Sequence, residues 1–317
     1  MENSNDNIEK VYKEFGTIND YFYVTDEGQV RVDTQHTSIL EDCHYKNTSG
    51  KYNCDDYFKL TICSVIYLLK TLKEKYKLED DKLAEYVILW LSYKLNRHST
   101  CSATNLNDFY TNNIEKNNDY NNKINGNDNL TYNAIINKIK DLMNTKEISK
   151  FNDPFSILFY LYNLFHGERL NCDTNLQLAK NFAKEFEKLN EDSNNTVDSS
   201  YNKLLSTLSN DYNNLINKYG NENKCPNFQS LSKIEPKKNS VEDSEKSSGQ
   251  LLEEASEGTS SSSSILNTVI PVLSTFAIPV FLGVAYKYSL FGIDKLFQRQ
   301  HIRNKLKKTT KKMELNI

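Results

Sequence analysis

The sequence predicts a mainly α protein in four parts, the first a helical-bundle ectodomain of residues 1–230. A disordered stalk rich in Ser, Glu and Lys (231–264), one transmembrane helix (265–286) and a basic cytoplasmic tail (287–317) follow it. Three observations lead to this prediction. Apolar residues recur at helical spacing, alternating strand patterns are almost absent, and one long uncharged apolar segment precedes a run of basic residues.

Three helices are expected in the first half of the ectodomain, over residues 55–76, 80–97 and 132–143. Asp55 and Asp56 suit the N-terminal end of the first, because carboxylates interact favourably with a helix N-terminus. Each helix has one apolar face with a spacing of three or four residues. The residues of these faces are Phe58, Ile62, Val65, Leu69, Leu72 and Tyr76; Leu83, Val87, Trp90, Leu91 and Leu95; and Ile135, Ile136, Ile139 and Leu142.

Three more helices are expected after residue 150. The first of them opens at Asp153 and Pro154, since Asp caps a helix and Pro fits its first turn. It stops near Gly167 and is apolar nearly all round, so we expect it at the centre of the bundle. The next carries an apolar face, and the last, over residues 199–219, ends at Gly220. Their apolar residues are Leu178, Phe182, Phe186 and Leu189, then Leu204, Leu208, Tyr212, Leu215 and Ile216.

Little else in the ectodomain has a regular pattern. Residues 21–32 are compatible with a short hairpin. The hydrophobic content of the chain is only 38%, partly because Asn is in excess, especially over residues 107–129. We interpret that Asn as solvent-facing loop and helix surface and infer no chemistry from it. From about Leu231 large apolar residues almost disappear, which predicts a flexible stalk.

The predicted membrane anchor runs from Ile265 to Tyr286. No residue between Glu257 and Lys287 carries a formal charge. A helix of this length spans about 33 Å, enough for a hydrocarbon core of about 30 Å. The alternative is a buried helix of a large soluble core, although such helices rarely run this long without a charge.

The charge asymmetry around the anchor predicts its orientation. Eight basic and two acidic residues give the chain from Asp294 onward a net charge of +6, and residues 1–286 carry −10 of the total of −3. Because basic flanks stay cytoplasmic, we expect the tail inside and the acidic domain outside. The tail is either an anionic-lipid binder or only a stop-transfer flank. Its basic residues are Lys287, Lys295, Arg299, Arg303, Lys305, Lys307, Lys308, Lys311 and Lys312.

Six cysteines precede the anchor and none follows it, which favours disulfides in an oxidising compartment. A Cys54–Cys63 bond is disfavoured, because nine residues of helix separate the two by roughly 13 Å. A Cys43–Cys54 bond is easier, and Cys63 is the best candidate for a free, buried thiol. The candidate disulfide cysteines are Cys43, Cys54, Cys63, Cys101, Cys172 and Cys225.

The sequence offers no catalytic, cofactor or metal site. Cys43, His44 and Cys54 lack a zinc spacing, the histidines are scattered, and no phosphate-loop, dinucleotide, nucleophile-elbow or HExxH motif occurs. The acidic ectodomain argues against a nucleic-acid partner. Glycosylation sequons at Asn47, Asn129 and Asn194 are short enough to arise by chance. No signal peptide is visible at the N-terminus.

Five segments in order resemble the Plasmodium interspersed repeat (PIR) proteins, most closely the yir, bir and cir groups of rodent malaria parasites. The resemblance covers about residues 43–308 and is most specific in the last segment. The chain departs from the family pattern near Phe159, where the resemblance would place a cysteine. The segments are CDDYFKLTICSVIYLL (54–69), LAEYVILWLSYKLN (83–96), NLNDFYTNNIEKNNDY (105–120), SSYNKLLSTLSNDYNNL (199–215) and IPVFLGVAYKYSLFGIDKLFQRQHIRNKLKK (278–308).

The resemblance implies a variant antigen of a multigene family, exported into or onto the infected red blood cell for immune evasion and host interaction, with no catalytic residues. Three hypotheses follow. The chain is a surface antigen that binds a host cell-surface protein or shields the cell, a structural or trafficking protein of a parasite or vacuolar membrane, or an enzyme. The absence of catalytic motifs disfavours the third.

Overall fold

The computed structural model describes residues 4–25, 28–33, 37–41, 43–96, 101, 106–116, 118–122, 131–140, 147–166, 172–220 and 227–238. The chain divides into two units, Met1–Lys238 and Asn239–Ile317, and every described residue belongs to the first. The predicted anchor, the basic tail and residues 239–264 of the predicted stalk lie outside the described residues.

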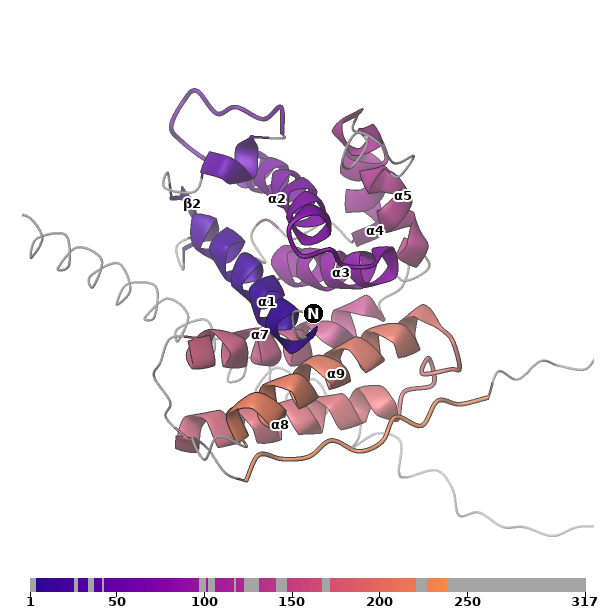
Figure 1. Ribbon diagram of the computed structural model, residues 1–317. Coiled ribbons are helices and arrows are strands. Elements are labelled where there is room, and N and C mark those ends of the chain that lie inside the picture. The colour runs from indigo at the N-terminus through magenta and orange to yellow at the C-terminus, as the bar shows by residue number, and fades with distance from the viewer. Residues whose placement is uncertain are drawn as a thin grey trace, which may run out of the picture. The chain divides into compact units, whose positions relative to one another are not determined.

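The described unit is mainly helical, as the sequence predicts (Figure 1). Its longer helices are α1 (Ser4–Tyr21), α2 (Cys54–Glu74), α3 (Asp80–Asn96), α7 (Asn152–His166), α8 (Cys172–Asn190) and α9 (Ser200–Gly220). Shorter helical segments are η1 (Thr37–Leu40), α4 (Leu106–Phe109), η2 (Tyr110–Ile114), η3 (Asn118–Asn121), α5 (Tyr132–Ile136), η4 (Asn137–Ile139) and η5 (Ile148–Phe151). The helix predicted over residues 132–143 is therefore α5 continued by η4, with residues 141–143 outside the described part.

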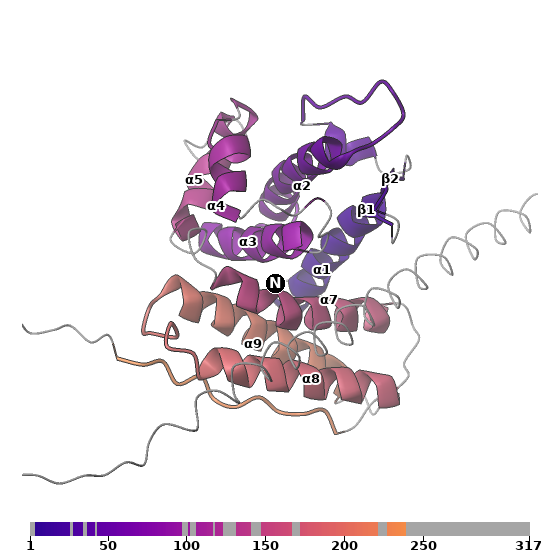
Figure 2. The same cartoon turned by 180° about the vertical axis from the view of Figure 1, so that it is seen from behind.

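Two helices lie at the centre of the bundle. α7 contacts α1, α3, α8 and α9, and α3 contacts α2, α5, α7 and α9. Figures 1 and 2 show α1, α2 and α3 on one side of α7 and the α8–α9 pair on the other. The central position predicted for the apolar helix at Asp153 is confirmed. α3 is buried without interruption from Leu83 to Leu95, which exceeds the single apolar face expected for it.

The start of α2 shows how local sequence sets a helix boundary. Asn53 is the N-cap, and its side chain accepts a hydrogen bond from the backbone amide of Asp56. Asp56 in turn accepts one from the Asn53 amide at 2.8 Å, which completes a capping box. The predicted role of this acidic pair at a helix start is confirmed for Asp56.

The hairpin expected over residues 21–32 is also present. β1 (Phe22–Val24) and β2 (Val30–Val32) pair antiparallel, with Phe22 opposite Val32. Gly28 adopts a positive φ of 77° in the connection, a conformation that glycine reaches without steric cost. The hairpin follows α1 directly and packs on α2.

The sequence patterns did not predict α1. Its composition is mainly polar, but apolar side chains stand at helical spacing among the polar ones. Val11, Tyr12, Phe15 and Ile18 are all at most 1% exposed. Gly16 faces α7, since a Cβ there would lie 3.2 Å from the side-chain oxygen of Asn163. α1 is therefore a packed part of the bundle.

The described Asn side chains within residues 107–129 are exposed or partly exposed, as interpreted, but apolar residues between them are buried. Phe109, Tyr110, Ile114 and Tyr120 are fully buried, and Tyr120 donates a hydrogen bond to the carbonyl of Ile62 at 3.0 Å. Sparse aromatic and aliphatic residues pack inward here while the Asn-rich remainder forms the outer side of α4, η2 and η3. Residues 123–130 are not described.

The C-terminal segment, residues 227–238, continues past the predicted start of the stalk. Asn190 donates to the carbonyl of Lys233 and accepts from the amide of Glu235. The amide of Lys237 donates to the carbonyl of Asn195 at 2.7 Å. Hydrogen bonds to α8 and the α8–α9 connection therefore hold residues 231–238, which we had assigned to the stalk, although they contribute few apolar side chains.

Candidate functional site

Two disulfides brace the N-terminal half of the domain. Cys43 is joined to Cys63 and Cys54 to Cys101, with Cα–Cα distances of 5.4 and 5.1 Å. Cys172 is also disulfide-bonded, and Cys225 lies outside the described residues. Cys43 therefore pairs with Cys63 and not with Cys54, the easier partner by sequence, and the alternative of a free thiol at Cys63 is wrong. Cys54 and Cys63 are not joined to each other, as expected.

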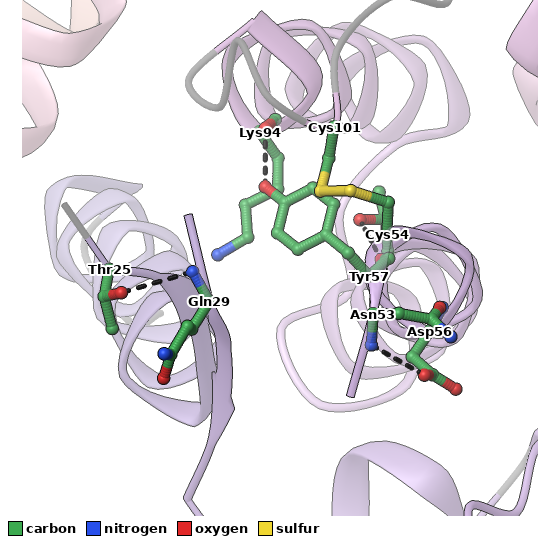
Figure 3. Close-up of a disulfide and its surroundings, with 9 residues drawn as sticks. Thr25, Gln29, Asn53, Cys54, Asp56, Tyr57, Lys94 and Cys101 are labelled. Atoms are coloured by element: carbon green, nitrogen blue, oxygen red, sulfur yellow. Dashed lines mark hydrogen bonds between the residues drawn. A yellow bond between two sulfur atoms is a disulfide. The ribbon is translucent and has the colours of Figure 1, made fainter. Parts of the chain in front are cut away.

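The geometry of α2 explains the observed pairing. Residues 43–53 are irregular and carry Cys43 back along α2 to Cys63, in the third turn of that helix, where the sulfur is fully buried. Cys54, in the first turn, faces the chain that follows α3 and meets Cys101 (Figure 3). Because the 43–53 connection has no regular structure, its length alone does not indicate its path.

A buried lysine lies next to the second disulfide. Lys94 is fully buried, and its ammonium donates to the carbonyl of Phe22 at 2.7 Å and lies 4.0 Å from the centre of the Phe22 ring. The Tyr57 hydroxyl donates to the carbonyl of Lys94 at 2.7 Å (Figure 3). Lys94 thus connects α3 to β1, and Tyr57 connects α2 to α3. We interpret this cluster as structural.

The loop before α2 is organised around Asp56. Burial favours a raised pKa for this carboxyl, but hydrogen bonds from Tyr45, Asn53 and Asn47 hold the pKa below its usual range. The Asn47 amide group also donates to the carbonyl of Lys51 at 2.9 Å. A glycan on Asn47 would break these contacts, so this sequon is poorly placed for modification.

Among the described residues, no three or more His, Cys, Asp or Glu side chains are placed so that they could hold a metal ion. His44 is exposed and contacts Asp119, a surface pair rather than a ligand set.

A buried carboxyl joins three helices on the other side of the bundle. Asp211 of α9 is 2% exposed, and its two oxygens accept hydrogen bonds of 2.9 Å from Tyr12 of α1 and Tyr86 of α3. Tyr162 of α7 donates to the backbone carbonyl of the same residue at 2.7 Å. Burial raises the pKa of Asp211 to about 7, against the two phenol hydrogen bonds, which lower it.

A second polar group adjoins this carboxyl. Lys82 lies 2.6 Å from Glu85, and both contact the hydroxyl of Thr207. Glu85 is buried, so the ammonium of Lys82 compensates a charge that would otherwise be costly inside the domain.

An open cavity of about 290 Å³ lies beside these two groups. Its lining comes from α1, the connection between α2 and α3, α3 itself and α9. The lining residues are Ile8, Val11, Tyr76, Lys77, Leu78, Glu79, Lys82, Tyr86, Thr207, Asn210 and Asp211. This is the described site that most resembles a ligand pocket, because a few polar groups converge on mostly apolar walls.

Sequence reasoning did not identify this cavity. Its groups are far apart in the chain, and the sequence separation of Tyr12 and Asp211 is 199 residues. One signal was present, since Asp211 stands at helical spacing from Leu204, Leu208 and Leu215 on the apolar face of α9. A carboxylate at such a position indicates either a buried polar cluster or a site.

The predicted anchor and tail residues, from Ile265 to Lys312, fall outside the described part of the chain. Among the helices that the structure describes, none combines the length and hydropathy needed for a membrane span.

Comparison with known proteins finds a family and solved structures that this chain resembles. Residues 12–287 match the family described as "Plasmodium variant antigen protein Cir/Yir/Bir". A solved Plasmodium structure, "Structure of a Plasmodium PIR protein ectodomain", is 32% identical and aligns over 72% of this chain and 99% of its own, with a TM-score of 0.48. A search of curated proteins gives no match.

Proposed function

The chain belongs to the Plasmodium variant antigen family Cir/Yir/Bir, and on that premise we propose that it is a single-pass membrane antigen displayed on or exported to the infected red blood cell. In this proposal residues 265–286 form the anchor, the helical domain lies outside, and the basic tail lies in the cytoplasm. The function is immune evasion and interaction with the host.

The cysteine chemistry is the observation that carries this proposal. Every cysteine within the described residues is disulfide-bonded. Disulfides persist in oxidising environments and are rare in the cytosol. A domain braced in this way is suited to the outside of a cell, which agrees with the orientation that the basic tail favours.

The described surface of the domain is suited to exposure to solvent. Val197, at 44% exposure, is the one large hydrophobic side chain exposed among the described residues. A host cell-surface protein that recognises this domain would therefore contact a largely polar surface. We assign the protein no catalytic activity, since its family is one of antigens.

A second role shares the same features. A structural or trafficking protein of a parasite or vacuolar membrane would have the same anchor and disulfides, with its domain in a lumen. Charge asymmetry determines sidedness but not the identity of the membrane.

Protease treatment of intact infected cells separates these roles. The full chain would carry one epitope tag before α1 and a different one after residue 317. We expect external protease to remove the N-terminal tag, because it reaches the predicted stalk, and to leave a fragment with the C-terminal tag. Permeabilised cells, in which both tags become accessible, provide the control.

Full protection of the N-terminal tag in intact cells would contradict surface display and favour the internal role. A variant in which Gln replaces the basic residues between Lys287 and Lys312 tests the orientation. Without those charges the anchor is expected to insert in both directions, so that part of the C-terminal tag becomes protease-sensitive in intact cells.

A further inference from the structure

The cavity beside Asp211 has a buried base and an exposed mouth. Val11, Tyr86, Thr207 and Asp211 are all buried and form its base. The lining residues Lys77, Glu79 and Asn210 are exposed and mark its opening to solvent. Its volume of about 290 Å³ is at the lower end of the range for small-molecule sites.

The carboxylate at the base has acceptor capacity for a further hydrogen-bond donor. An ionised carboxylate offers about four acceptor positions. Tyr12 donates to one oxygen of Asp211 and Tyr86 to the other, so the two phenols use one position on each. They also hold the carboxylate in place between α1 and α3, which orients it for a ligand.

Among the charged lining residues, only Asp211 lacks a match of opposite sign, because Glu85 matches Lys82 and Glu79 matches Lys77. The ammonium of Lys82 lies 2.6 Å from the Glu85 carboxylate, so these two charges match each other. At the mouth, Lys77 and Glu79 carry opposite charges. With Asp211 ionised, the site therefore favours a cation over an anion.

The walls suit an apolar or aromatic body. Ile8, Val11 and Leu78 provide aliphatic surface, and Tyr76 and Tyr86 provide rings. Tyrosine rings attract organic cations as well as apolar groups. The negative charge at the base and the apolar walls together are complementary to an amphipathic ligand with a cationic end.

We propose that this cavity binds a small organic amine, with its ammonium on the Asp211 carboxylate and its apolar or aromatic body against Val11, Leu78 and the two tyrosine rings. This is a binding function separate from display of the domain, and it does not depend on the membrane anchor.

The protonation of Asp211 makes the affinity depend on pH. Since burial raises its pKa to about 7, a proton competes with the ammonium below neutral pH. We expect amine affinity to fall by about tenfold from pH 8 to pH 6. The titratable and charged groups that face Asp211 are Tyr12 from α1, Lys82, Glu85 and Tyr86 from α3, and Tyr162 from α7.

The test compares two probes of nearly the same shape. Tyramine carries an ammonium where tyrosol carries a neutral hydroxyl. Calorimetric titration of the full chain in detergent, at pH 8 and with a blank micelle titration subtracted, is expected to give at least about tenfold tighter binding of tyramine. Equal affinities, or no binding of tyramine, would overturn the proposal.

Two variants locate the site. Asp211→Asn is expected to abolish the preference for tyramine, while Asp173→Asn, an exposed carboxylate on α8, leaves it unchanged. Ile8→Trp fills the cavity from its half-buried side and is expected to prevent binding of both probes without loss of the thermal unfolding transition. If both Asp211→Asn and Ile8→Trp still bind tyramine more tightly than tyrosol, the amine binds elsewhere and the proposal is contradicted.

Discussion

At the scale of single residues, buried polar side chains determine which helices meet. Asp211 of α9 takes hydrogen bonds from α1 and α3, and Lys94 of α3 donates to β1. Glu14 of α1 accepts from Tyr67 of α2 and from Tyr76, just beyond that helix. A shift of one of these helices by a turn would break its contact and leave a buried polar group without a partner, which is costly. These residues therefore favour one arrangement of the bundle over others with similar apolar burial.

The pH dependence of stability tests the state of Asp211. Its folded pKa of about 7 lies above its ordinary value, so its contribution to stability is fully present below about pH 4 and lost as the pH rises through 7. We expect the difference in unfolding free energy between the native chain and Asp211→Asn to fall by up to about 1.4 kcal/mol per pH unit between about pH 4 and 7, and to level off above pH 7.

Urea unfolding at pH 5, 6, 7 and 8, followed by circular dichroism, measures this difference. Asp56, Asp81 and Asp192 have lowered pKa values, so their contributions are lost only at lower pH. Asp173→Asn is the control and should run parallel to the native chain. A difference for Asp211→Asn that does not change with pH would mean that this carboxyl does not titrate in the window.

At the scale of elements, the longer helices after residue 50 were predictable and α1 was not. α2, α3 and α7 carry enough apolar residues to reveal their period, and Asp56 and Gly220 mark helix ends. α1 was missed because its composition is polar, although Val11, Tyr12, Phe15 and Ile18 stand at helical spacing. Phe109, Tyr110 and Ile114 were hidden among asparagines for the same reason.

The cysteine pairing and the cavity could not be predicted because both depend on the path of the chain. Six cysteines allow fifteen connectivities, and an irregular loop leads from Cys43 to Cys54. The cavity requires α1, α3 and α9 to converge, which no local pattern encodes. Only Asp211, on an apolar face, was a local sign of it.

The burial of α1 predicts that the domain needs it to fold. Phe15 is fully buried and its ring lies 5.6 Å from that of Trp90, in a stacked arrangement. We expect Phe15→Ala to lower the unfolding free energy by about 3–5 kcal/mol, because it leaves a cavity in the aromatic core. Lys13→Ala, on the exposed side of the same helix, should change it by less than about 0.5 kcal/mol.

A chain that begins at residue 20 extends this test to the whole helix. Such a chain lacks the buried side chains of Val11, Tyr12, Phe15 and Ile18, and we expect it to give no cooperative unfolding transition. A cooperative transition with native midpoint in that chain would mean that α1 is dispensable.

At the scale of the whole molecule, a polar composition is combined with a covalently braced core. Hydrophobic residues make up 38% of the chain and Asn is abundant, so much of the surface is free to vary without loss of the core. The Cys54–Cys101 bond closes a loop that contains all of α2 and all of α3. The disulfides thus act on the part of the bundle that α3 organises, and we expect the stability of the domain to depend on the redox state of its compartment.

Reduction of the disulfides tests this dependence. In the chain-entropy account, closing a loop of 47 residues stabilises a fold by about 4 kcal/mol and one of 20 residues by about 3 kcal/mol. We therefore expect Cys54→Ser/Cys101→Ser to lower the urea midpoint at least as much as Cys43→Ser/Cys63→Ser. The two loops overlap in sequence, so the loss on removing both should be smaller than the sum.

Dithiothreitol extends the test to the native chain, which has one more disulfide to reduce than either double variant. The reagent should therefore shift the urea midpoint of the native chain by more than it shifts the midpoint of either double variant. If it leaves the native midpoint unchanged, the domain does not need an oxidising compartment, and the main support for its external position is lost.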